Sequence, residues 1–446
     1  MNRKEFIKKF SLLSAGLVSI PTLFSQEKSQ HNSTGLIKDP NGILDLPPGF
    51  SYKIISKEKE VMDDGLLVPP NADGMACLKM SDDKVILIRN HELGHVPKLS
   101  IFLKNNHYGK KYRKYKIKNA EKFYDIKNTK THCLGGTTSI VYNTKTEQVE
   151  KQYLSLAGTL VNCSGGVTPW NTWISCEETV MKNGKGITKE HGYNFEVIPS
   201  YNPNLTQAIP LKDMGRFRHE GIAFDSNGYV YQTEDRSEGL FYRFIPKIKN
   251  KLSQGGKLQI LSFSDFRGEN TNNWKNNKIK LGKTYNVKWI DIDDVYSHDD
   301  DLRYRGRNIG GATFSRGEGI FCYKDIIYFT ATNGGKNKTG QIWKYIPNNK
   351  GGTIELFYES EDDNVLNMPD NIVLSPHGDI LLCEDARGRD GIVCIKKDGS
   401  IYHLVNNALN NQELAGPTFS PDGKILFLNL YNPTMTFAIK GPWDQL

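Results

Sequence analysis

Short stretches that alternate hydrophobic and polar residues recur along the chain, and turn residues separate them. One unit, which begins near Arg218, reads HEGIAFDSNG, YVYQTEDR, GLFYRFIP and KLQILSF. Alternation of β-branched and aromatic residues between such turns predicts β-strands. Similar units begin near Asn71, Asn162, Gly317, Pro369 and Ala415, which makes six in total. Repetition of four-stranded units predicts an all-β fold, a six-bladed β-propeller.

In two of the predicted blades, the repeat pattern shows only three strands, and a fourth strand has to be found. The last unit contains three strands, and we expect the N-terminal strand at residues 50–56, FSYKIIS, to complete it. This pairing closes the ring and protects its exposed edge. For the second unit, residues 207–212 are the expected fourth strand.

The predicted organisation is a signal peptide over residues 1–26 and a single catalytic propeller domain over residues 27–446. Loop insertions near residues 93–133 and 264–309 interrupt the repeat spacing. Long loops in compact folds tend to be lids or spacers. The acidic part of the second insertion favours a solvated loop, with calcium binding as the alternative.

The first residues have the pattern of an export signal. Charged residues at positions 2–9 precede an apolar run over residues 10–24, as in a secretory signal that leaves no membrane span once it is removed. Arg3-Lys4 resembles a twin-arginine signal with lysine in the second place, so the export route stays open between the twin-arginine and general pathways. We expect a periplasmic or secreted monomer.

Charge and cysteine content narrow the function classes. The formal net charge is +8, but basic residues are scattered, and the densest run, residues 110–118, reads as a solvated segment. A specific nucleic-acid partner is therefore not expected. The seven cysteines are an odd number for an exported chain, so at least one stays unpaired. Cys322 and Cys383 lie within apolar strands and read as buried thiols.

Polar residues recur at two equivalent positions of the repeat. The first lies where the innermost strand begins, and the units place there Asp73, Cys163, Glu220, Glu318, Asp370 and the apolar Ala415. The second lies where the next strand ends, and the units place there Glu92, Glu177 or Glu178, Glu234, Asn333, Glu384 and Asn429. Because neighbouring strands of a blade are antiparallel, both positions should gather at one mouth of the central channel.

A ring of carboxylates at one mouth predicts bound cations. Like-charge repulsion would otherwise raise the pKa of several of these groups, and carboxylates are ligands for hard cations. Cys163 adds a thiolate and favours a transition metal such as iron beside calcium, with a buried structural thiol as the alternative. Arg316 is the expected anion partner, with charge balance for the ring as its alternative role. His91 and His219 each precede a ring glutamate. For each of them three roles are open, namely a general acid, a residue that supports a metal ligand, or a packed imidazole.

The chain resembles the PhoX family of alkaline phosphatases. The matching stretches extend from about Pro47 to Pro433 and include IRNHE, LAGTLVNCSGGVTPWNTWISCEE, GRFRHEGIAFD, YQTEDR, RGEGI and MPDNIVLSPHGDILLCED. The resemblance implies an exported propeller that hydrolyses phosphate monoesters at an iron–calcium cluster. By motif, it implies Cys163, Glu220 and Glu318 as ligands of iron (Fe³⁺). It implies Glu178, Glu234, Asp235 and Glu384 as the calcium (Ca²⁺) shell, and Arg316 as the substrate-phosphate arginine.

Two alternatives belong to other classes. One is a calcium-dependent lactonase-like hydrolase, which would use fewer carboxylates around a single ion. The other is a non-catalytic propeller that binds a partner, which would leave the carboxylate ring without a role. Motifs for nucleophilic or nucleotide-binding chemistry, such as Gly-x-Ser-x-Gly or a Walker loop, do not occur in the sequence, which is compatible with metal-assisted hydrolysis.

Overall fold

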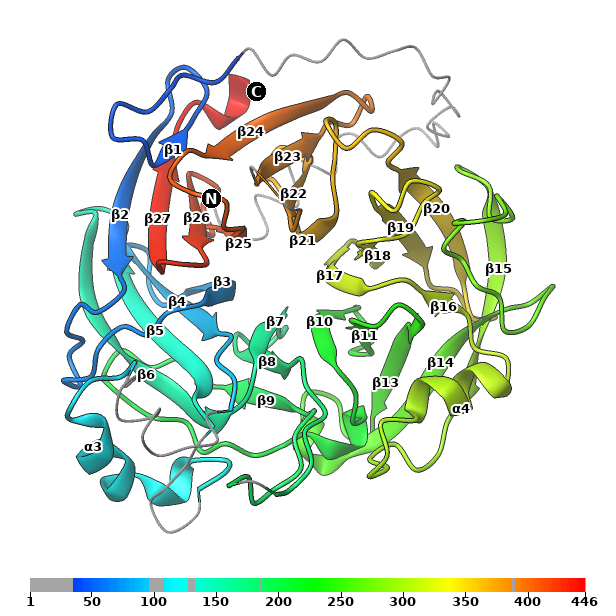
Figure 1. Ribbon diagram of the computed structural model, residues 1–446, viewed down its shortest axis with the longest axis horizontal. Helices are drawn as coiled ribbons and strands as arrows, with labels where there is room; N and C mark the ends of the chain where they lie inside the picture. Colours follow the sequence, from blue (N-terminus) through cyan, green and yellow to red (C-terminus); the bar gives the residue numbers. More distant parts are fainter. Residues whose placement is uncertain are drawn as a thin grey trace.

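In the computed structural model, β-sheets radiate from a central opening (Figure 1). The structure describes residues 35–95, 107–126, 133–184, 186–386, 388 and 390–445. The predicted signal peptide over residues 1–26 lies outside these residues. Among the described residues, helices are few and short, namely α3 (Tyr112–Lys118), α4 (Leu302–Asn308), η2 (Ala120–Lys122), η3 (Lys212–Met214), η4 (Leu252–Gln254) and η5 (Trp443–Gln445). Within the described part of the chain, no helix is long and apolar enough to cross a membrane.

The first two sheets follow the chain in order. One contains β3 (Ala72–Lys79), β4 (Lys84–His91), β5 (Gly135–Asn143) and β6 (Gln148–Thr159). The other contains β7 (Asn162–Val167), β8 (Trp173–Glu177) and β9 (Asn194–Val197). The fourth strand predicted at residues 207–212 is absent from this described segment, where Pro210 forms only an isolated bridge to Phe195. A proline lacks the backbone N–H that would continue the strand ladder.

The last two sheets are joined to the N-terminal segment. One contains β21 (Pro369–Leu374), β22 (Ile380–Glu384), β23 (Gly391–Ile395), β24 (Ile401–Asn407) and β1 (Leu44–Asp45). The other contains β25 (Leu414–Phe419), β26 (Ile425–Leu430), β27 (Met435–Lys440) and β2 (Ser51–Lys57). The antiparallel pairing of β2 with β27 is the predicted closure by an N-terminal strand. The additional pairing of β1 with β24 was not predicted from the sequence.

The remaining strands correct the prediction of six separate blades. A nine-stranded sheet has one arm of β10 (His219–Phe224), β11 (Val230–Glu234), β13 (Tyr242–Pro246) and β14 (Gly256–Phe263). Its other arm contains β17 (Gly317–Tyr323), β18 (Ile326–Ala331), β19 (Gln341–Ile346) and β20 (Thr353–Glu359). Between the arms, β15 (Thr284–Asp291) pairs with both β14 and β20. The short strands β12 (Gly239–Leu240) and β16 (Thr313–Phe314) form a two-stranded sheet.

The fused sheet has a physical cause in the second insertion. In β15, Tyr285 and Val287 are buried whereas their neighbours Thr284, Asn286 and Lys288 are exposed, so this part of the insertion has the alternation of a strand. Buried aromatic rings pack in the same core cluster, as in the stacked pair Phe241 and Phe329, whose centroids lie 4.3 Å apart. The fold is therefore an all-β, propeller-like ring of four separate sheets and one nine-stranded sheet.

Candidate metal centre

The innermost strand of each sheet or arm carries a characteristic residue at its second position. These innermost strands are β3, β7, β10, β17, β21 and β25, and they surround the central opening (Figure 1). Their second residues are Asp73, Cys163, Glu220, Glu318, Asp370 and Ala415. In all six pairs with the neighbouring strand, the register shifts close to this residue. A β-bulge bends a strand and redirects a side chain, so the bulges turn these residues toward the channel.

A cavity of about 250 Å³ collects five of these six side chains, all except Ala415, together with two further sets. One set is the residue directly after the second strand of a sheet, and it comprises Glu92, Glu178, Asp235 and Asp385. The other set is the residue directly before an innermost strand, and it comprises Arg218, Arg316 and Glu413. The cavity therefore contains nine carboxyl groups, one thiol and two guanidinium groups, a formal excess of seven negative charges if every carboxyl group is ionised.

Two residues expected in the calcium shell lie outside this cavity. Glu234 is fully buried and accepts hydrogen bonds from the Leu240 backbone N–H and from the Tyr242 hydroxyl. Glu384 accepts a hydrogen bond from the Asn367 backbone N–H at 2.8 Å. Both are the last residue of a strand, and the residue that follows each of them lines the cavity instead. Among the predicted site residues, the structure brings together Glu92, Cys163, Glu178, Glu220, Asp235, Arg316 and Glu318.

Side chains of the second strands hold the backbone of the cavity-lining residues in place. Asn90 Nδ2 donates to the Cys163 carbonyl at 3.1 Å, and Asn429 Nδ2 donates to the Asp73 carbonyl at 2.7 Å. In the same way, Thr330 Oγ1 donates to the Asp370 carbonyl at 2.9 Å. Each donor is the penultimate residue of its strand and bonds to the next sheet around the ring. These buried hydrogen bonds fix the relative positions of neighbouring ligand residues, and the repeat pattern alone does not reveal them.

Glycines after the ligand residues let the innermost strands approach one another. A Cβ atom added at Gly319 would lie 2.5 Å from the Asp370 carbonyl oxygen, and one added at Gly74 would lie 2.5 Å from the Ser164 Cα atom. Both distances are far below van der Waals contact. The Asp-Gly and Glu-Gly pairs of the repeat therefore combine a ligand with the space that the neighbouring ligand strand needs.

We expect Gly319→Ala to weaken cation binding in the cavity strongly and to destabilise the chain by about 1–3 kcal/mol, the usual cost of overpacking. The matched control is Gly317→Ala on the same strand, where the added Cβ would meet its nearest atoms at 3.4 Å, an ordinary contact. Urea unfolding and calcium titration measure the two effects. Equal stability and equal cation affinity of the two variants would contradict the close approach of β17 and β21.

Burial and mutual repulsion make the carboxyl groups difficult to ionise without cations. Burial raises the pKa of Glu220 well above its usual value, and the charges of Glu318 and Asp370 raise it further. The pKa of Asp370 is raised to about 7 by burial and then by the charge of Asp385. Burial, followed by the charge of Glu220, also raises the pKa of the Cys163 thiol well above its usual value. These shifts describe the chain without metal, and a bound cation would reverse their sign.

The two arginines neutralise one side of the cavity. Arg316 donates from Nε to Asp235 at 3.0 Å and from a terminal nitrogen to Glu318 at 2.6 Å, and it lies 3.4 Å from Asp385. Burial opposes the charge of Arg316, but Glu318 and Asp235 raise its pKa overall. Its backbone has a φ of 54°, a left-handed conformation that is uncommon outside glycine and is often found at functional sites. Arg218 forms an ion pair with Glu178 and lies 3.8 Å from Asp235.

The donor atoms fit more than one cation. Ligand atoms of Cys163, Glu178 and Glu220 lie within 4.8 Å of one another, and so do those of Glu220, Glu318 and Asp370. Glu220 belongs to both groups and is therefore placed to connect two cation positions. The first group contains a thiol, which favours a transition metal, whereas the second contains only carboxylates, which also suit calcium.

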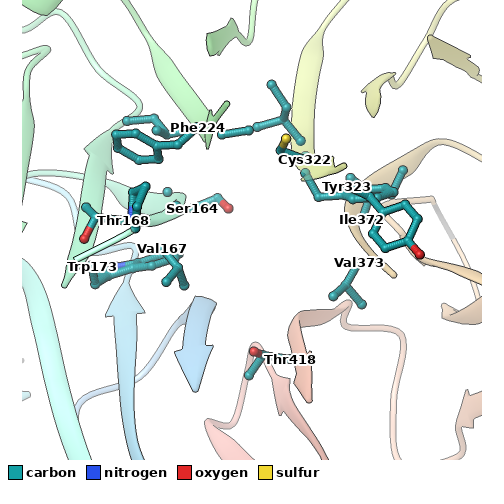
Figure 2. Close-up of a pocket in the computed structure, with 18 of the residues that line it drawn as sticks. Ser164, Val167, Thr168, Trp173, Phe224, Cys322, Tyr323, Ile372, Val373 and Thr418 are labelled. Atoms are coloured by element: carbon teal, nitrogen blue, oxygen red, sulfur yellow. The ribbon is translucent and has the colours of Figure 1, made fainter. Parts of the chain in front are cut away.

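A second cavity, of about 1070 Å³, opens along the remainder of the innermost strands. Its labelled lining includes Val167, Phe224, Ile372 and Val373 (Figure 2). The charged residues that line it are Asp225, Lys249, Lys324 and Asp325. Of these, Asp225 accepts hydrogen bonds from Tyr229 and Tyr231, and Asp325 accepts them from Ser226. This cavity is larger, but most of the ionisable side chains that could bind a cation or take part in a reaction line the acidic cavity.

Three cavity residues were missed in the sequence, namely Arg218, Asp385 and Glu413. A signal for them exists in the repeat: Arg218 and Arg316 stand at equivalent positions, each two residues before a ring glutamate. Likewise, Asp385 follows Glu384 as Asp235 follows Glu234. Glu413 has no acidic counterpart at the equivalent position of the other units, and only the folded chain brings it to the cavity.

The fold and the cavity define a propeller-like, all-β protein with an acidic centre suited to several cations. Residues 32–434 match the model of the family described as alkaline phosphatase PhoX, and the chain belongs to this family. The protein is therefore a metal-dependent alkaline phosphatase.

The chain is similar to several solved structures, and the first of those below supports the fold. Pseudomonas fluorescens PhoX in complex with vanadate, a transition state analogue, is similar with a TM-score of 0.63 and 17% identity, over 90% of this chain and 96% of that chain. A gluconolactonase from Xanthomonas campestris is similar over 89% of this chain and 98% of that chain, with a TM-score of 0.44 and 10% identity. No curated protein sequence matches the chain.

Proposed function

We propose that the acidic cavity is the active site, and that it hydrolyses phosphate monoesters to inorganic phosphate with iron and calcium as its metals. The observation that carries this proposal is the composition of the cavity, in which nine carboxyl groups and one thiol face two guanidinium groups. A single cation would leave most of this negative charge uncompensated. The same cavity also contains cationic groups for an anionic substrate.

Iron fits the group that contains the thiol, with Cys163, Glu178 and Glu220 as the residues that would hold it. Calcium fits the carboxylates around it, among them Glu318, Asp370, Asp235 and Asp385. When bound, such metals supply Lewis-acid stabilisation of phosphate oxygens and lower the pKa of an attacking water. This division modifies the assignment implied by resemblance in two ways. Glu178 takes the place of Glu318 beside Cys163 and Glu220, because its ligand atom lies within 4.8 Å of theirs. Glu234 and Glu384 leave the calcium shell, because they lie behind the cavity wall.

The arginines orient the substrate in this proposal. Arg316 presents a planar guanidinium group at the cavity with a quarter of its side chain exposed. A guanidinium group matches two phosphate oxygens at once and stabilises negative charge that develops during the transfer. Arg218 lines the same cavity with a similar exposure of 29%, so it is available for a second phosphate contact.

Export follows from the charged residues 2–9 and the apolar run at residues 10–24. We place the working enzyme in the periplasm or outside the cell; the twin-arginine pathway would suit a chain loaded with metal before export, and the general pathway is the alternative. The proposed working unit is a monomer.

The test is metal analysis of the purified protein together with turnover of p-nitrophenyl phosphate before and after treatment with a calcium chelator. We expect to find iron and calcium in the protein. Chelation should abolish most of the turnover, and added calcium should restore it. A single bound calcium with lactone hydrolysis would instead support the lactonase class. A metal-free, folded and inactive protein would support a binding function.

The same measurements on Cys163→Ser separate the two metals. We expect this variant to lose iron and to lose activity by about a hundredfold or more, since a serine hydroxyl is a poor ligand at neutral pH. The matched control is Cys394→Ser, which replaces a fully buried cysteine on β23 outside the cavity lining. Full activity of Cys163→Ser would remove the thiol from the site.

A further inference from the structure

A second group of metal-ligating side chains lies outside the acidic cavity. It consists of Asp125, just after η2, Cys133, just before β5, and His191, between β8 and β9. All three residues are buried, with exposures of 1%, 0% and 0%. The group thus joins three segments that are distant in the sequence, two of them from the insertion near residues 93–133.

Two of the three distances between the ligand atoms are close to those of a tetrahedral site. His191 Nε2 lies 3.7 Å from Cys133 Sγ and 3.5 Å from Asp125 Oδ2. Ligand atoms of all three residues lie within 4.8 Å of one another. Bond lengths of about 2.3 Å to sulfur and about 2.0–2.1 Å to nitrogen and oxygen place tetrahedral ligand pairs roughly 3.3–3.6 Å apart. A small cation therefore fits between the three atoms with little movement.

The histidine is oriented as a metal ligand would be. His191 Nδ1 lies 2.6 Å from Glu177 Oε1 and points its other nitrogen, Nε2, at the cysteine and the aspartate. Glu177 is itself fixed by the backbone N–H groups of Leu160 and Gly192. Metal-binding histidines commonly donate their second ring nitrogen to a carboxylate, which fixes the ring and its tautomer.

The aspartate is oriented in a similar way. Asp125 accepts hydrogen bonds from the backbone N–H groups of Thr188 and Lys189 at 2.7 Å and 3.0 Å. Its carboxylate thereby spans from the insertion to the segment that carries His191. These bonds hold the ligand oxygen in place independently of any cation.

We propose that Asp125, Cys133 and His191 bind a zinc ion that stabilises the fold. A thiolate, an imidazole and a carboxylate together favour zinc over calcium or magnesium. Zinc would replace the thiol proton and one imidazole proton, so the formal charge of this buried group would not change and two protons would be released. This site is distinct from the catalytic cluster in its ligands, and no residue of this group lines the acidic cavity.

Zinc at this site would stabilise the position of a residue in the acidic cavity. Glu177, which holds His191, is followed directly by Glu178, one of the cavity carboxylates. Zinc would tie the insertion to the segment between β8 and β9 and would stabilise the position of Glu178. We expect the zinc-loaded chain to unfold at a higher temperature than the chain without zinc, because only the folded chain has the complete ligand set.

Cobalt spectroscopy on the full chain tests the proposal. The Cys163→Ser background removes the thiolate of the acidic cavity, so a charge-transfer band between thiolate and Co²⁺ would report on another cysteine. We expect one equivalent of Co²⁺ to produce this band and one equivalent of zinc to abolish it. The band should be lost in Cys163→Ser/Cys133→Ser and retained in the matched control Cys163→Ser/Cys394→Ser.

Two results would overturn the zinc site. One is absence of the band in folded Cys163→Ser protein, which would leave the group a hydrogen-bonded network around a protonated His191. The other is persistence of the band after Cys133 is replaced. Should the double variants fail to fold, crystals of the unaltered chain grown with zinc decide the question by anomalous scattering at the zinc edge. A peak between the three ligand atoms supports the proposal, and no peak there refutes it.

Discussion

Replacement of Glu220 by glutamine is expected to lower kcat/KM for p-nitrophenyl phosphate by at least about a thousandfold. Glu220 belongs to both groups of potential ligand atoms, so its loss removes a shared ligand and weakens two cation positions together. Loss of metal charge from a phosphoryl-transfer site removes several kcal/mol of transition-state stabilisation. Kinetic assays and metal analysis of the same preparation check this expectation.

Although Glu220→Gln should lower activity, it should not lower the folding stability of the metal-free chain. The pKa of Glu220 is raised well above its usual value by burial and by Glu318. The unfolded chain releases this proton near pH 4.3, whereas the folded chain retains it to higher pH. The contribution of this group to folding stability is thus present at low pH and is lost as the pH rises through the folded pKa. Glutamine does not titrate, so metal-free Glu220→Gln should be at least as stable as the unaltered chain at pH 8.

Glu384→Gln is the matched control for Glu220→Gln. Glu384 lies outside the cavity, and its pKa is raised to about 8 by burial, so glutamine resembles the protonated side chain and can still accept the Asn367 N–H. We expect it to keep its metals and activity within about threefold. Retention of both metals and more than a tenth of the activity in Glu220→Gln would contradict the shared-ligand position.

Arg316→Lys is expected to lower kcat/KM by about a hundredfold to a thousandfold and to weaken inhibition by inorganic phosphate, while the metal content stays constant. Lysine keeps the positive charge but cannot form the planar two-point contact of a guanidinium group with phosphate. The loss should therefore appear in phosphate recognition and in transition-state stabilisation rather than in metal binding. Steady-state kinetics with phosphate as a product inhibitor provide the measurement.

Arg236→Lys is the control for this second expectation. Arg236 follows Asp235 but pairs with Asp300 at 2.8 Å, and it does not line the acidic cavity. Its replacement should change kcat/KM less than about twofold. Simultaneous loss of metals and activity in Arg316→Lys would assign this arginine to charge balance among Asp235, Glu318 and Asp385.

Much of the fold was predictable because the repeat combines alternation with turn residues. The innermost strands begin within about two residues of the expected positions, and the N-terminal strand pairs with the last sheet as expected. The fused nine-stranded sheet was not predictable in the same way. The fused sheet forms because β15 pairs with both β14 and β20. The sequence pattern of a strand does not indicate which other strands it will pair with.

The sequence pattern locates one of the three sets of residues that line the acidic cavity. Asp73, Cys163, Glu220, Glu318 and Asp370 line the cavity at the positions where the innermost strands begin. At the ends of two second strands, the residue that lines the cavity lies one position after the expected glutamate. Glu234 and Glu384 accept hydrogen bonds from nearby backbone N–H groups, and Asp235 and Asp385 line the cavity instead. Beyond a strand end, the direction of a side chain follows from the local backbone and no longer from alternation.

The sequence by itself determined an all-β, repetitive fold with recurring acidic residues at one end of its innermost strands, since periodicity and antiparallel pairing are local properties of the chain. Only the tertiary structure decided that Arg218 and Glu413 join the centre, and that Asp125, Cys133 and His191 meet. These groups come from loops and strand ends whose positions depend on how separate sheets pack, and no local pattern encodes the distance between them.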